Sequence, residues 1–265
     1  MTMNTILQSL PAFLLIFVRI TAFFVSAPVF SNRSIPAMHK IGFSFFVSYI
    51  VFFMVNQGPL GSVDDFIFLL LKEVIVGLAL GIIASIVMSA IQVAGGLIDF
   101  QTGFSMATIF DPQSGMQSPL MGQFFNVITM LFLLSVNAHY LLLQGILNSF
   151  KIIPINQVGL PFGQEAFIAH IIQIFMSMFV IAFQMALPVV ASLFLVDVAL
   201  GILTRIVPQL NIFVVGMPLK VLVAFGLLII GMPTFIILVQ HLFELITHST
   251  NSIIQLIGGM KDGVH

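Results

Sequence analysis

The sequence predicts an all-α membrane protein built from about six long, kinked hydrophobic helices. Of its 265 residues, 60% are hydrophobic and only 6% are charged, and the mean hydropathy is +1.20. A soluble domain carries about 25% charged residues, so this chain could not cover a water-facing surface. The second observation is a set of six apolar runs, and the third is one polar interruption between them, at residues 98–123.

Each apolar run is taken as one membrane span, because about 20 hydrophobic residues cross a bilayer as a helix. The runs cover residues 6–30, 41–56, 66–93, 122–150, 166–203 and 213–246. The first run contains Arg19, has no basic residues before it and lacks a small-residue cleavage site. We therefore expect a retained span rather than a signal peptide. Kinks are expected in the overlong last two runs, at Pro188, Pro218 and Pro233.

The chain changes character near residue 166. Irregular polar loops, at residues 31–40 and 57–65 among others, separate the first four runs, and another loop, residues 151–164, follows the fourth. The last two runs are expected to form a long helical hairpin, with Arg205, Pro208 and Asn211 in its turn. We therefore expect two parts, residues 1–165 and residues 166–265.

The polar interruption reads IDFQTGFSMATIFDPQSGMQSPLMGQ. A bilayer core cannot satisfy the backbone hydrogen bonds of an irregular segment of this kind. It must lie outside the membrane, inside protein or beside a water-filled path. In a chain with so little other polar chemistry, this is the first place to look for function.

Several ionisable residues lie inside or beside the apolar runs. Such residues are costly in lipid and indicate function by default, facing a bundle interior or an aqueous path. One interpretation is a proton or ion relay through Glu73, Asp99 or Asp197, as in an ion-coupled secondary transporter. The other, which we favour, is ion pairing within a multi-subunit assembly that fixes the register of that assembly. The residues are Arg19, Lys72, Glu73, Asp99, Asp197 and Arg205.

Motifs for catalysis are missing from the sequence. The chain has no cysteine, and its histidines are not arranged at zinc-ligand spacing. Ser105 in TGFSM lacks the G-x-S-x-G pattern of a nucleophile, and Gly95 and Gly96 begin no dinucleotide motif. We expect no enzyme, no cofactor and no metal, and an intramembrane protease is a remote alternative. The net charge of −1 gives no footprint for nucleic acid.

Two longer motifs resemble those of a known family. They are G-x-S-x-A-x-x-x-D-P, from Gly103 to Pro112, and R-x-x-P-x-x-N-x-F-x-x-G-x-P-x-K, from Arg205 to Lys220. Together with NAHYLLL after Val136, they resemble the FliR family of flagellar biosynthesis proteins, whose relatives serve virulence type III secretion systems. The likeness covers nearly the whole chain, but it does not distinguish a flagellar from a virulence system.

The resemblance implies a subunit of a protein export gate in the bacterial plasma (inner) membrane, at the flagellar basal body. Family members join FliP and FliQ there and work with FlhB and FlhA to export unfolded flagellar subunits. Residues 1–165 would be the FliP-like part and residues 166–265 the FliQ-like hairpin. The turn and subunit contacts would involve Arg205, Pro208, Asn211, Pro218 and Lys220.

The resemblance also implies a role for the polar interruption. The loop after the Asp-Pro pair would project into the pore and help to plug the closed gate. Helix breakers and apolar bulk in the same loop suit a seal that can move aside. The residues concerned are Phe110, Asp111, Pro112, Gln113, Ser114, Gly115, Met116 and Gln117. A plain surface loop is the alternative.

Overall fold

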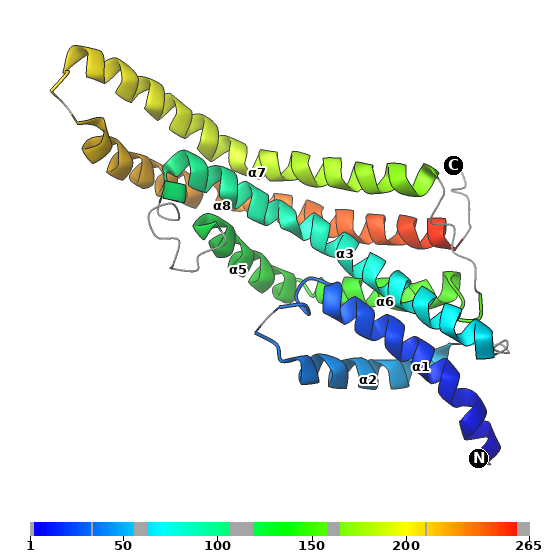
Figure 1. Cartoon of the computed structure of the whole chain (residues 1–265). Helices are drawn as coiled ribbons and strands as arrows, with labels where there is room; N and C mark the ends of the chain where they lie inside the picture. The colour runs from blue at the N-terminus through cyan, green and yellow to red at the C-terminus, as the bar shows by residue number, and fades with distance from the viewer. Residues whose placement is uncertain are drawn as a thin grey trace. The chain divides into compact units, whose positions relative to one another are not determined.

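The computed structural model describes residues 3–32, 34–55, 63–106, 119–157, 165–209 and 211–258. The described residues form seven α-helices and no strand, and this confirms the predicted all-α class. They are α1 (Met3–Ser26), α2 (Ala37–Met54), α3 (Val63–Thr102), α5 (Leu120–Ser135), α6 (His139–Ile152), α7 (Glu165–Ile206) and α8 (Ile212–Ile257), as Figure 1 shows. Within these ranges four helices are long and apolar enough to cross a membrane, or five spans if α5 and α6 count as one.

The chain divides into two compact units. The first unit contains residues 1–87, 136–175 and 244–265, and the second contains residues 88–135 and 176–243. Helices α3, α7 and α8 each contribute residues to both. These units follow spatial contacts and do not test the two parts, 1–165 and 166–265, that the sequence predicts.

Helix α3 is longer than the predicted run, which ended at Val93. It continues through Asp99 and Gln101 to Thr102, so the polar interruption begins inside a helix. The polar side chains are tolerated there because they have partners: Asp99 accepts hydrogen bonds from Met121 N, and Gln101 donates to Asp197. Satisfied polar groups do not carry the cost of burial that unpaired ones do.

The fourth predicted run is broken. Helix α5 ends at Ser135 and α6 begins at His139, and Asn137 between them adopts a φ of 58°. Asparagine tolerates this left-handed conformation better than most residues, because its short polar side chain can bond locally. The sixth run, expected to end at Ile246, continues instead to Ile257.

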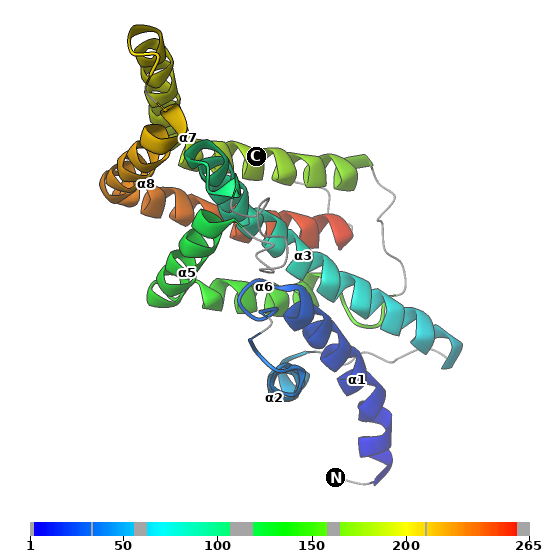
Figure 2. The same cartoon turned by 60° about the vertical axis from the view of Figure 1, so that its left-hand side comes forward.

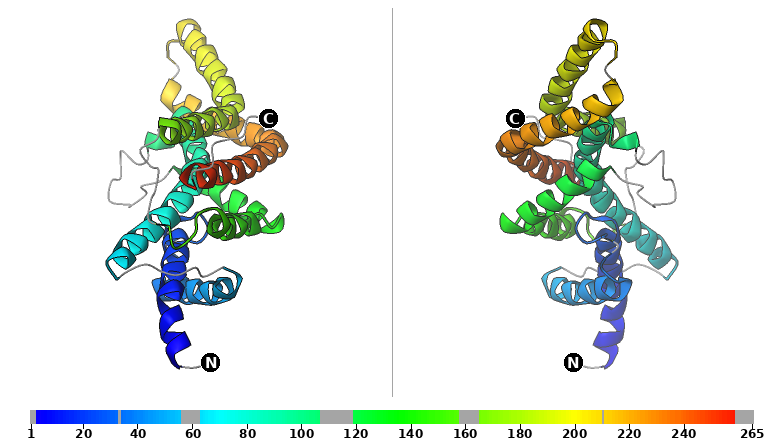
Figure 3. Two further views of the ribbon diagram at one scale, coloured as in Figure 1. Left: turned by 90° about the vertical axis from the view of Figure 1, so that its right-hand side faces the viewer. Right: turned by 90° about the vertical axis from the view of Figure 1, so that its left-hand side faces the viewer.

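In the first unit, α1 packs against both α2 and α3. Phe13 of α1 meets Phe45 and Phe52 of α2 edge-on, with ring centroids 5.5 and 5.9 Å apart. The views in Figures 2 and 3 agree that α2 lies beside α1. Gly77 and Gly81 of α3 permit the close approach of α1, because a Cβ at Gly81 would lie 2.8 Å from Ala27 N and one at Gly77 would overlap the carbonyl of Arg19.

Candidate functional site

Arg19 of α1 is the centre of a buried charged cluster in the first unit. Its Nε and Nη2 atoms contact both carboxylate oxygens of Glu73 on α3, with 2.9 Å from Nη2 to Oε1. Nη1 donates to Ser149 Oγ at 3.1 Å, and Nη2 also donates to the carbonyl of Ile153 at 3.0 Å. The guanidinium lies 4.2 Å from the ring centroid of Phe150. One side chain thus ties α1 to α3 and to the end of α6.

Lys72 completes this cluster from the adjacent position on α3. Its Nζ lies 2.7 Å from Glu73 Oε1, and it donates to the carbonyls of Pro154 at 2.7 Å and Ile155 at 3.2 Å. Two cations and one carboxylate leave the cluster with a net charge of +1. The main-chain carbonyls after the C-terminus of α6 offset that charge, since a helix C-terminus carries partial negative charge.

The cluster is fully desolvated. Arg19 and Glu73 are 0% exposed and Lys72 is 2% exposed. Removing one member of a buried ion pair typically costs about 3–5 kcal/mol, because a charge then remains without its partner. The cluster can therefore fix α1, α3 and the end of α6 in one register, which is a structural role.

A second network lies in the second unit, where α3, α7 and α8 meet. Lys220 of α8 forms an ion pair with Asp197 of α7, and Gln101 of α3 donates to Asp197 Oδ2 at 2.8 Å. Lys220 Nζ also reaches the carbonyl of Gln101 at 3.5 Å. The side chains of Lys220 and Asp197 are 20% and 38% exposed, so solvent screens this pair more than the Arg19 cluster.

Beside this network, α3 and α5 cross at very close range. A Cβ at Gly95 would lie 2.8 Å from the carbonyl carbon of Met121 and would overlap the main chain of Gly122. One turn further along α3, both carboxylate oxygens of Asp99 accept from Met121 N, at 3.2 and 3.1 Å. The carboxylate therefore stands at the N-terminus of α5, where unpaired N–H groups and the helix dipole favour an anion.

The predicted hairpin residues lie in and around the turn between α7 and α8. Arg205 is exposed in the last turn of α7, and Pro208 follows in the turn itself. Asn211 Oδ1 accepts a hydrogen bond from Phe213 N at 3.0 Å and so caps the start of α8. Pro218 lies inside α8. The predicted plug loop, residues 110–117, lies outside the described residues.

Sequence reasoning missed three members of these networks. Gln101 belongs to the polar interruption, so its polarity in IDFQTGF was a usable signal. Ser149 and Phe150 lie in a run that looks like ordinary membrane helix, and nothing local marks them. In the part of the chain that the structure describes, three or more His, Cys, Asp or Glu side chains nowhere gather as metal ligands would.

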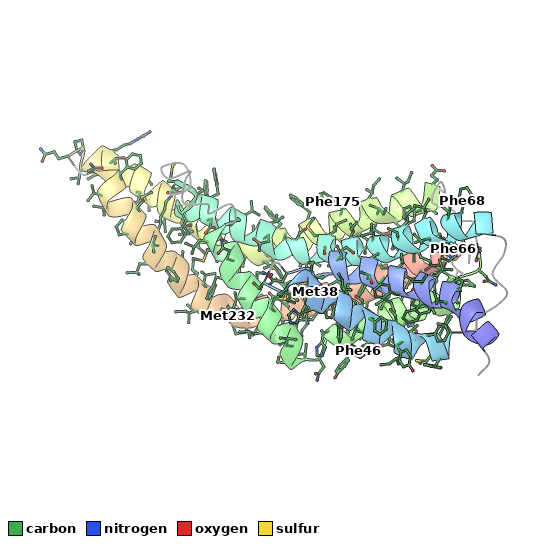
Figure 4. The ribbon with its side chains drawn as sticks, turned by 60° about the horizontal axis from the view of Figure 1, so that its bottom comes forward. Met38, Phe46, Phe66, Phe68, Phe175 and Met232 are labelled. Atoms are coloured by element: carbon green, nitrogen blue, oxygen red, sulfur yellow. The ribbon has the colours of Figure 1, made fainter. Side chains whose placement is uncertain are left out.

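Large apolar faces remain open on several helices. In an apolar 18-residue stretch of each helix, 56% of α3 is buried, but only 17% of α2, 28% of α7 and 17% of α8. Phe46, Phe68 and Phe175 are 68%, 62% and 52% exposed, and Figure 4 shows all three on the outer sides of their helices. Open apolar faces of this kind mark contact with lipid or with other membrane subunits.

Comparison with known proteins gives these features a context. The model of the bacterial export proteins, family 1, matches residues 10–246. The chain is 51% identical to the flagellar biosynthetic protein FliR of Bacillus subtilis (strain 168) over 257 residues, 97% of this chain and 99% of that protein. It is 34% identical to FliR of Pectobacterium carotovorum subsp. carotovorum over 233 residues, covering 86% of this chain and 87% of that protein.

FliR of Escherichia coli (strain K12) is 31% identical over 230 residues, 85% of this chain and 86% of that protein. The chain therefore belongs to the bacterial export proteins, family 1, the family of the FliR flagellar biosynthetic proteins.

Proposed function

We propose that the chain is a non-catalytic subunit of the flagellar type III protein export gate and forms part of its pore. The observation that carries the proposal is the 51% identity to a FliR protein over 97% of the chain. Family membership makes it a membrane-embedded subunit of the flagellar export apparatus. The finer proposal is that it lies in the bacterial plasma (inner) membrane, at the flagellar basal body, and passes unfolded flagellar subunits.

We propose FliP and FliQ as its partners in the gate, with FlhB and FlhA in the surrounding apparatus. The open apolar faces of α7 and α8 support this, because a chain that leaves so much of two long helices uncovered has surface for other membrane subunits. The division into a FliP-like part, 1–165, and a FliQ-like hairpin, 166–265, belongs to the same proposal.

The closed gate must be sealed, because an open polypeptide pore would dissipate the ion gradient across the membrane. We propose that residues 110–117 form this seal. The described residues on either side support the idea: Asp99 and the Gly95–Gly122 crossing fix the end of α3 and the start of α5, which flank the loop in the sequence. Rigid ends would let the loop move without disturbing packed helices.

An ion-coupled transporter, the alternative function, is not favoured. Its candidate carboxylates are Glu73, Asp99 and Asp197. Glu73 is held by two cations, Asp99 accepts from the main chain of α5, and Asp197 is bound to Lys220 and Gln101. Carboxylates engaged in this way are suited to fixing helices in register.

The test is replacement of FliR in Bacillus subtilis by this chain. Restored swimming and restored secretion of flagellar subunits into the medium are expected, because the two proteins align over nearly their whole lengths. Native mass spectrometry of the tagged chain, with and without co-expressed FliP and FliQ, then gives its partners. A stable lone monomer indifferent to both proteins, in cells that stay non-motile, would refute the proposal.

A further inference from the structure

A groove of about 750 Å³ lies between the end of α2 and the end of α6, within the first unit. One wall is apolar and includes Val51 and Met54 of α2. The other wall includes Gln144, Asn148 and Lys151 of α6. These three residues are spaced by four and three positions, so they share one face of that helix. A polar stripe thus faces an apolar wall across a space of ligand size.

Among the described residues that line the groove, the charged side chain is a cation, that of Lys151. The side chain of Lys151 is exposed and has no ion-pair or hydrogen-bond partner within the described residues. Phe150, Pro154 and Ile155 also line the groove and contact the buried Arg19–Lys72–Glu73 cluster: Phe150 packs against Arg19, and the carbonyls of Pro154 and Ile155 accept from Lys72. No Asp or Glu lines the groove among the described residues, so its field favours an anion.

Hydrogen-bond donors accompany the positive charge. The side chains of Gln144, Asn148 and Asn156 border the groove, and in the described part of the chain none of the three has a hydrogen-bond partner. A carboxamide offers two N–H donors, and a lysine ammonium offers three. Phosphate oxygens are pure acceptors and form strong charge-assisted bonds with such donors. The polar wall is therefore matched to a phosphate group.

We propose that this groove binds the headgroup of an acidic phospholipid, with Lys151 and the amides of α6 on its phosphate. The apolar wall favours a lipid over free phosphate. Met54 is 72% exposed and its neighbour Phe53 is 65% exposed, so acyl chains have an apolar surface to pack against. A zwitterionic headgroup would bring its own cation into an already positive groove. The proposal is independent of the export function and needs only the chain's place in a membrane.

Native mass spectrometry of the full-length chain, purified in mild detergent with the subunits that remain attached, tests this. Phosphatidylglycerol and phosphatidylcholine are titrated separately, and the fraction carrying one lipid is measured. Lys151→Gln is expected to weaken phosphatidylglycerol binding about fivefold, the usual contribution of one basic residue near an anionic lipid surface. Lys151→Arg should keep the binding. Lys40→Gln, at the opposite end of α2, removes the same charge away from the groove and should change nothing.

Three results would overturn the proposal. One is equal binding of both lipids, and another is equal loss with Lys151→Gln and Lys40→Gln. The third is displacement of phosphatidylglycerol by inorganic phosphate at the same concentration, which would mean a site for the free anion. If Lys151→Gln fails to accumulate, the wild-type comparison of the two lipids and Asn148→Leu, expected to weaken phosphatidylglycerol alone, decide the question.

Discussion

Arg19 and Glu73, 54 residues apart in the sequence, form a two-point ion pair in which neither side chain is exposed to solvent. The pair joins α1 to α3, and Glu73 also holds Lys72. One carboxylate is therefore shared by two buried cations. This unequal division of charge predicts unequal effects of mutation.

Glu73→Gln should destabilise the protein more than Arg19→Met. The first change leaves Arg19 and Lys72 buried without an anion and is expected to cost about 3–5 kcal/mol. The second leaves a neutral Lys72–Glu73 pair, and methionine fills part of the vacated volume. Thermal unfolding of the purified, partner-bound chain measures the order, with Lys40→Met as the control for a charge outside the cluster. A larger loss for Arg19→Met would contradict this account.

Gly95→Ala should disrupt the crossing of α3 and α5, whereas Gly96→Ala should not. A methyl at Gly95 would overlap the main chain of Gly122, which cannot move as a side chain can, and overpacking of this kind costs about 1–3 kcal/mol. At Gly96 the nearest atom is Pro119 Cγ at 3.4 Å, so alanine fits and improves helix propensity by up to about 1 kcal/mol. The melting temperatures of the Gly95→Ala and Gly96→Ala variants test this, and equal shifts in the two would argue against the close crossing of α3 and α5.

Exchanging the charges of Lys220 and Asp197 should restore function only in part. Each single reversal places like charges together on α7 and α8 and is expected to lower motility. The double variant Lys220→Asp with Asp197→Lys restores an ion pair. It also places a carboxylate against the carbonyl of Gln101, which in the wild-type chain accepts a hydrogen bond from Lys220. Swimming diameter and secreted flagellar protein give the readout. Full recovery would mean that Gln101 takes no part.

Shortening residues 110–117 should make cells leak small ions while the subunit still assembles, if this loop is the seal. The ends of α3 and α5 remain held by Asp99 and by the glycine crossing, so the helices keep their places. Membrane potential and growth in high salt report the leak, and co-purification with FliP reports assembly. Unchanged permeability in a correctly assembled variant would show that the seal lies elsewhere.

The two charged networks show how far sequence reasoning reaches. Lys72 and Glu73 are adjacent in the sequence, but neighbouring helix positions do not face each other, so their contact is known only from the structure. The positions of Arg19 and Glu73 do not reveal their contact, because it depends on how α1 and α3 pack side by side. Gln101 lies in the polar interruption and could have been picked out from the sequence. Ser149 and Phe150 lie in an apolar run that does not mark them as members of a charged network. Residues that act through distant contacts are visible only once the helices are in place.

By itself the sequence determined the all-α membrane class, the approximate places of the apolar helices and the family, because hydropathy and motif spacing are local properties of the chain. The tertiary structure alone decided that α3 continues to Thr102, that the fourth run breaks at Asn137, and that Asp99 caps α5. It also decided which cation meets which carboxylate. The physical reason is that a buried polar group is tolerated only where a hydrogen-bond or ion-pair partner lies within reach. The partners here come from helices far apart in the sequence.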